Sequence, residues 1–124
     1  MSDRISFLTN PTGGAQVLLM NFAGFAAPAD ALPHIAAAAA LIAEQPTASV
    51  RTMVDVTGSK CNIEVVESLK QFVAGNRPYV IASAIIGMSG LQRIILDGIL
   101  TFSSRSNLKS FAERAEALQW LASM

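Results

Sequence analysis

The sequence predicts a single α/β domain over residues 1–124, built on a mixed, largely parallel sheet of about five strands. Strand-like runs alternate with helical patterns along the chain in the order β-β-α-β-α-β-α-β-α, which indicates parallel strands joined by helical crossovers. Apolar residues make up 52% of the chain and charged residues 15%, a balance that excludes disorder. A chain of 124 residues buries one core but not two.

The first two strands are expected to form a hairpin. Residues Arg4–Thr9 and Gln16–Phe22 are strand-like, and the segment Asn10–Gly14 between them combines proline with two glycines. Proline fixes φ and glycine accepts positive φ, so this segment predicts a turn.

A helix is expected over Asp30–Gln45, with Pro33 tolerated because it falls in the first turn. Pro46 ends it. Helical spacing puts four apolar residues on one face: Leu32, Ile35, Ala39 and Ile42.

The middle of the chain predicts a strand, a helix and a central strand. Val50–Val56 is the strand, Asn62 is a good N-cap for the helix, and Gly75–Pro78 is expected to end that helix. Tyr79–Ile86 is almost unbroken apolar, as expected of a strand covered on both faces. One arc of the helix is apolar: Val65, Val66, Leu69, Phe72 and Val73.

The C-terminal part predicts a third helix over Leu91–Phe102, a short strand over Leu108–Phe111 and a last helix over Glu113–Ala122. In the third helix, Leu96 and Leu100 lie on the side of Arg93. The core-facing arc is formed by Leu91, Ile94, Ile95, Ile99 and Phe102. The Leu96–Leu100 pair therefore predicts an apolar patch for a homodimer, a partner or a lid over an apolar ligand, unless the last helix buries it.

Charge and hydropathy exclude several classes of protein. Nine basic and nine acidic residues give a formal net charge of zero, which argues against nucleic-acid binding. The most apolar stretches, Ile35–Ala43 and Tyr79–Leu91, are shorter than the roughly 18–20 residues of a membrane span. Cys61 is the only cysteine, so no intrachain disulfide forms, and we expect a cytoplasmic protein without a signal peptide.

Catalytic machinery is not evident in the sequence. Ser89 lies in a strand–turn–helix segment, but Leu91 stands where a nucleophile elbow has glycine, and His34 is the only histidine. No spaced set of metal ligands and no phosphate-loop or dinucleotide motif occurs. We therefore expect no enzyme activity, no cofactor and no metal.

Two loops are candidates for binding, because loops after the carboxyl ends of parallel strands form the usual ligand crevice. They are Thr57–Asn62 and Gly87–Gly90, and each leads into a helix N-terminus that favours an anion, with Lys60 and Arg93 as possible helpers. Ordinary helix caps are the alternative. The candidate ligand- or partner-binding residues are Thr57, Gly58, Ser59, Lys60, Asn62, Glu64, Ser89, Gly90, Arg93, Leu96 and Leu100.

Five segments of the chain match a known pattern: Asp55–Gly58, Pro78–Val80, Ala82–Ile95, Phe102–Arg105 and Ala115–Leu121. In these segments the chain resembles the STAS/SpoIIAA-like family of small bacterial proteins, and Asp55–Gly58 resembles the Asp-x-Ser/Thr-Gly turn of that family. The resemblance covers most of residues 15–124 and is densest over residues 78–121. The resemblance implies the STAS-type α/β fold, which anti-sigma factor antagonists share and, more distantly, Sec14-like lipid-binding domains.

The resemblance implies a regulatory module that binds a protein, or forms a homodimer, without catalysis. The alternative is a carrier or sensor of a small apolar or lipid-like ligand, held between the sheet and the third helix. Relatives carry a phosphorylated serine at the start of the second helix, where this chain has Asn62–Val65 without a hydroxyl. Glu64 resembles at most a permanently charged form, and Ala112 stands where relatives have a cap for the last helix.

Overall fold

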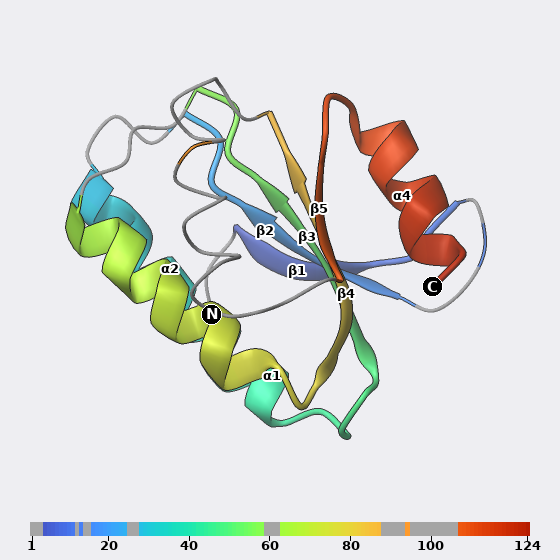
Figure 1. The fold of residues 1–124 in the computed structure, drawn as a ribbon, viewed down its shortest axis with the longest axis horizontal. Coiled ribbons are helices and arrows are strands. Elements are labelled where there is room, and N and C mark those ends of the chain that lie inside the picture. The colour runs from blue at the N-terminus through green and yellow to red at the C-terminus, as the bar shows by residue number, and fades with distance from the viewer. Residues whose placement is uncertain are drawn as a thin grey trace.

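A computed structural model describes residues 4–11, 13, 16–24, 28–58, 63–87, 94 and 107–124. In this part of the chain a sheet lies between helices on both of its faces (Figure 1). The expected third helix lies outside the described residues except for Ile94. The side chain of Ile94 is 70% exposed, so the prediction that it faces the core is wrong.

The sheet has five strands in sequential order, β1-β2-β3-β4-β5. β1 is antiparallel to β2, and the other neighbouring pairs are parallel. This arrangement confirms the mixed, largely parallel sheet. The strands are β1 (Ile5–Leu8), β2 (Val17–Asn21), β3 (Val50–Asp55), β4 (Val80–Ile86) and β5 (Leu108–Phe111).

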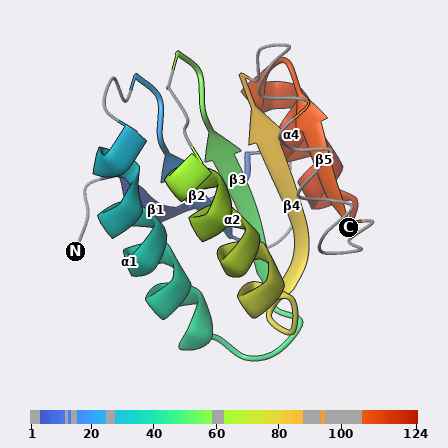
Figure 2. The same cartoon turned by 60° about the vertical axis from the view of Figure 1, so that its left-hand side comes forward.

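Three α-helices are described: α1 (Leu32–Ala43), α2 (Ile63–Asn76) and α4 (Arg114–Ala122). α1 and α2 lie side by side on one face of the sheet, and α4 lies on the other face (Figures 1 and 2). The predicted first turn of α1 is instead a 3-10 helix, η1 (Pro28–Ala31), and Pro33 lies in the first turn that follows. α2 ends at Asn76, within the segment Gly75–Pro78 that was expected to end it, so this boundary is confirmed.

The larger core lies between the sheet and the α1–α2 pair. Leu18, Met20 and Ile42 are completely or almost completely buried in it. α1 buries Ile35, Ala38 and Ile42, whereas the sequence placed Ala39 on this face. Ala38 and Ala39 are three and four residues after Ile35, so they lie on opposite sides of the helix stripe that contains Ile35. Ala38 is buried in the core against the sheet, whereas Ala39 lies on the side of α1 that faces α2.

The smaller core lies between the sheet and α4. It consists of Val17, Met53, Ala82, Ala84, Ile86, Ala117 and Leu121, each at most 3% exposed. Three alanines let the helix approach the sheet closely. β4 contributes buried residues to both cores, which confirms that it is covered on both faces.

Polar side chains hold the C-terminal end of α4. The guanidinium of Arg51, on β3, donates from Nε to the carbonyl oxygen of Leu121 at 3.1 Å and from Nη2 to that of Met124. Asn10 Nδ2 donates to the carbonyl oxygen of Leu118 at 2.8 Å. Of these acceptors, Leu121 belongs to the last four residues of α4, whose carbonyls lack i+4 partners within the helix, and a cation at this end also suits the helix dipole.

One hydroxyl pair lies inside the sheet. Thr52 Oγ1 donates to Ser83 Oγ at 2.6 Å across β3 and β4, and both residues are at most 5% exposed. A buried hydroxyl without a partner costs free energy, so the pair favours this register over neighbouring ones.

A double-mutant cycle tests this pair. Thr52→Val alone removes one hydroxyl and is expected to lower the free energy of unfolding by about 1–3 kcal/mol. The double variant Thr52→Val/Ser83→Ala should lose less free energy of unfolding than the two single variants lose together. The difference, which is the coupling energy of the pair, should be about 1 kcal/mol. Urea unfolding measures all four proteins, and additive effects would contradict the proposed coupling.

Candidate functional site

The starts of the two predicted binding loops lie side by side at the carboxyl edge of the sheet. Backbone hydrogen bonds continue the sheet beyond the strands, from Val56 N to Ile86 O at 3.0 Å and from Gly24 N to Thr57 O at 2.9 Å. A Cβ atom on Gly87 would lie 2.0 Å from Thr57 Oγ1 and 2.8 Å from Thr57 Cα. The loop after β4 therefore passes directly against the loop after β3.

Asp55, the last residue of β3, organises this edge. Its Oδ1 accepts the backbone N–H of Thr57 at 3.0 Å and the Thr57 hydroxyl at 2.7 Å. These two bonds form a local turn in which the aspartate side chain satisfies the backbone two residues later. Gly58 completes the turn with a φ of +68°. The Asp-x-Thr-Gly spacing thus has a direct structural reason.

The other carboxylate oxygen of Asp55 binds a distant arginine. Arg114, the first residue of α4, donates to Oδ2 from Nη2 at 2.8 Å and from Nε at 3.3 Å. The Asp55 side chain is 9% exposed and that of Arg114 is 46% exposed. The guanidinium therefore covers the carboxylate on one side and meets solvent on the other.

The ionised form of Asp55 is favoured at this site. Burial alone raises the pKa of the carboxyl, but the hydrogen bonds from Thr57 and Arg114, together with the charge of Arg114, outweigh it. The pKa of Asp55 consequently lies below its ordinary value. The carboxylate stays charged at neutral pH, with both oxygens engaged by donors.

The N-terminus of α4 is weakly capped without Asp55. The N-cap is Glu113, one residue after the expected Ala112, and its side chain makes no capping hydrogen bond. Arg114 places a positive charge at the positive end of the helix dipole, which is unfavourable. The Asp55 carboxylate neutralises this charge, so the ion pair also supports the start of α4.

The structure describes three of the predicted site residues. Thr57 and Gly58 form the turn at the carboxyl edge, and Glu64 is exposed in the first turn of α2. The others lie outside the described residues: Ser59, Lys60, Asn62, Ser89, Gly90, Arg93, Leu96 and Leu100.

Arg114 was not among the residues predicted from the sequence. Arg114 and Asp55 are 59 residues apart, and no local pattern connects an arginine after the last strand with an aspartate after a central one. The one usable signal was an arginine at a helix N-terminus, a position where the dipole disfavours it and a carboxylate partner is expected.

The close approach of Gly87 to Thr57 predicts a large effect of substitution. Gly87→Ala places Cβ against Thr57 at a φ of +81°, and should lower the free energy of unfolding by at least about 3 kcal/mol. Gly58→Ala is the control, because φ is +68° there but Cβ would meet nothing within 4 Å. It should cost about 1–2 kcal/mol. Equal losses in chemical denaturation would show that the Thr57 contact is unimportant.

The lowered pKa of Asp55 predicts a pH-dependent contribution to stability. The contribution is present above the pKa of the unfolded chain, near 4, and is lost as the pH falls through the lower pKa of the folded protein. Asp55→Asn should lower the free energy of unfolding by about 1–3 kcal/mol at pH 7. This difference should shrink in strong acid.

Urea unfolding at pH 7 and at pH 3 measures this difference. Asp30→Asn changes an exposed carboxylate on η1 and should alter stability by less than about 0.5 kcal/mol at both pH values. A deficit in Asp55→Asn that is equally large at both pH values would contradict an ionic role for this carboxylate.

Among the described residues, no three His, Cys, Asp or Glu side chains are grouped so that they could hold a metal ion. No helix in the described ranges is long and apolar enough to cross a membrane. The chain matches no protein-family model, no curated protein and no solved structure.

Proposed function

We propose that this chain is a non-catalytic regulatory module that binds a protein partner through the carboxyl edge of its sheet. The contact surface consists of the Thr57–Gly58 turn, the first turn of α2 with Glu64, and Arg114. The observation that carries the proposal is the half-exposed guanidinium of Arg114, fixed on a buried carboxylate beside this turn.

Preorganisation supports this function. Thr57 is held by Asp55 and by the backbone of Gly24, so a partner meets a turn whose conformation is already selected. Binding to an ordered surface loses less conformational entropy than binding to a loose one. Arg114 keeps part of its guanidinium free for solvent or an acidic group of the partner, and arginine is enriched in binding hot spots.

The state of Asp55 also favours binding over catalysis at this edge. A general base needs an oxygen free to accept the proton of a substrate. Here Oδ1 accepts two hydrogen bonds from Thr57, and Oδ2 accepts two from Arg114. The resemblance of Asp55–Gly58 and of residues 78–121 to the STAS/SpoIIAA-like family supports a regulatory role for the same edge.

Site-specific photo-crosslinking tests the proposal. A benzophenone amino acid replaces Glu64 at the carboxyl edge, and in a matched control it replaces Glu44, which is exposed just after α1 at the opposite edge. Irradiation in a lysate of the native host should yield one discrete adduct from position 64 and none of that mass from position 44. An adduct of twice the chain mass would identify a second copy as the partner.

A charge variant sharpens the same experiment. Arg114→Gln should reduce the yield of the position-64 adduct about fivefold, the change produced by about 1 kcal/mol of binding free energy. Lys109→Gln, an exposed change on β5, should leave the yield unchanged. Circular dichroism verifies that both variants are folded. The same adduct from positions 64 and 44, or no adduct from position 64, would refute the proposed surface.

A further inference from the structure

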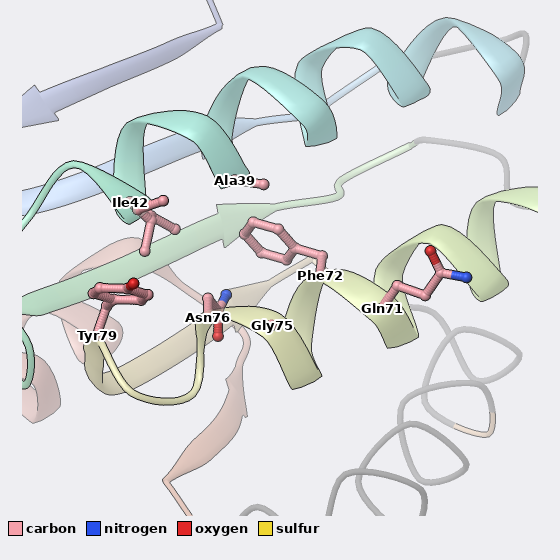
Figure 3. Close-up of a pocket in the computed structure, with 8 residues that line it drawn as sticks. Ala39, Ile42, Gln71, Phe72, Gly75, Asn76 and Tyr79 are labelled. Atoms are coloured by element: carbon pink, nitrogen blue, oxygen red, sulfur yellow. The ribbon is translucent and has the colours of Figure 1, made fainter.

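A small cavity opens between the C-terminal halves of α1 and α2, far from the carboxyl edge (Figure 3). Its volume is about 160 Å³. The floor and walls come from both helices and from the turn that follows α2. The lining residues are Ala39, Ile42, Ala43, Gln71, Phe72, Gly75, Asn76 and Tyr79.

The cavity exists because the residues that face each other across the two helices are small. Ala39 and Ala43 lie one turn apart on α1, and Gly75 lies on α2. A Cβ atom added to Gly75 would meet nothing within 4 Å. No side chain of these three positions reaches into the space between the helices.

Gly75 has no backbone reason to be glycine. It lies within α2, its φ is not in the positive range, and no neighbour approaches the place of its missing side chain. Glycine inside a helix costs about 1 kcal/mol relative to alanine. Gly75 is exposed, so the space in front of it is the solvent-facing mouth of the cavity.

The lining suits an apolar ring. Ile42 and Phe72 are 1% and 9% exposed, and the rings of Phe72 and Tyr79 both border the cavity (Figure 3). Aromatic groups pack on one another in offset or edge-to-face arrangements. Gln71 is exposed at the rim, and its amide group points away from the two rings (Figure 3).

The volume restricts the size of the ligand. Sites for nucleotides and drug-sized molecules measure about 300–1,000 Å³, well above the 160 Å³ found here. An apolar cavity of about 150 Å³ accommodates benzene. We propose that this cavity binds a small neutral compound with a single aromatic ring.

This site differs from the location that the sequence predicted for an apolar ligand. The space beside the third helix lies outside the described residues, whereas the cavity lies between α1 and α2 at the amino edge of β3 and β4. Hydrogen bonds from the backbone of Ser49 and Val50 to Tyr79 O, at 3.0 and 2.9 Å, hold this end together.

Titration with phenol, followed by amide chemical shifts, tests the site. Phenol should shift the amides of Ala39, Ala43 and Gly75 along a saturable curve with a Kd of about a few millimolar, which is typical of a seven-atom ligand. Cyclohexanol, its saturated counterpart, should bind at least about fivefold more weakly. Shifts that do not saturate, or equal binding of both compounds, would overturn the assignment.

Two variants at one position separate cavity filling from effects on folding. Gly75→Leu extends a side chain into the open space and should weaken phenol binding at least about tenfold. Gly75→Ala adds only Cβ and should leave the Kd within about twofold. Both changes raise helix propensity, so both proteins should fold, as thermal unfolding will show. Phenol binding by Gly75→Leu at the strength of the unmodified chain would refute the proposed site.

Discussion

The position of α4 depends on β3, because the two ends of this strand hold the two ends of the helix. Arg51 binds the carbonyls at the C-terminal end, and Asp55 binds Arg114 at the N-terminal end. From Arg51 to Asp55 a strand extends about 13 Å at 3.3 Å per residue. From Arg114 to Ala122 the nine-residue helix α4 extends about 12 Å at 1.5 Å per residue. The matching lengths allow one residue at each end of the strand to reach its end of the helix, so α4 runs opposite to β3.

These polar contacts matter because α4 has little apolar surface to fix its position. Ala117 and Leu121 are its buried residues, whereas the opposite face of the sheet is covered by α1 and α2 together. Asp55 also holds Thr57. One carboxylate therefore determines where α4 begins and how the loop after β3 starts. A change in the position of α4 would alter the same turn that is proposed to meet a partner, which links the packing of the helix to the function of the edge.

The sequence predicted the elements well wherever their evidence is local. Alternating and helical spacing identify strands such as Val80–Ile86 and helices such as Arg114–Ala122 from residues that are neighbours in the chain. Contacts between distant elements have no such signal. The pairing of Asp55 with Arg114 arises only after the sheet has formed. The choice of Ala38 over Ala39 for burial depends on where α2 packs. The cavity has the same origin, since it is a property of two helices and not of either sequence segment.

Two glycines show why composition alone could not locate the sites. Gly87 was expected to begin the loop after a strand, and Gly75 was expected to lie in the segment that ends a helix. At Gly87 the backbone has a φ of +81° and Thr57 occupies the place of a side chain, so the fold itself requires glycine. At Gly75 the helix is regular and the space is empty, so the fold would accept alanine and gain stability from it. A residue that the fold requires explains the geometry of the carboxyl edge. Gly75 costs stability although the backbone does not require it, and the missing side chain leaves the cavity between α1 and α2 open, which is why this cavity is proposed to bind a small aromatic compound.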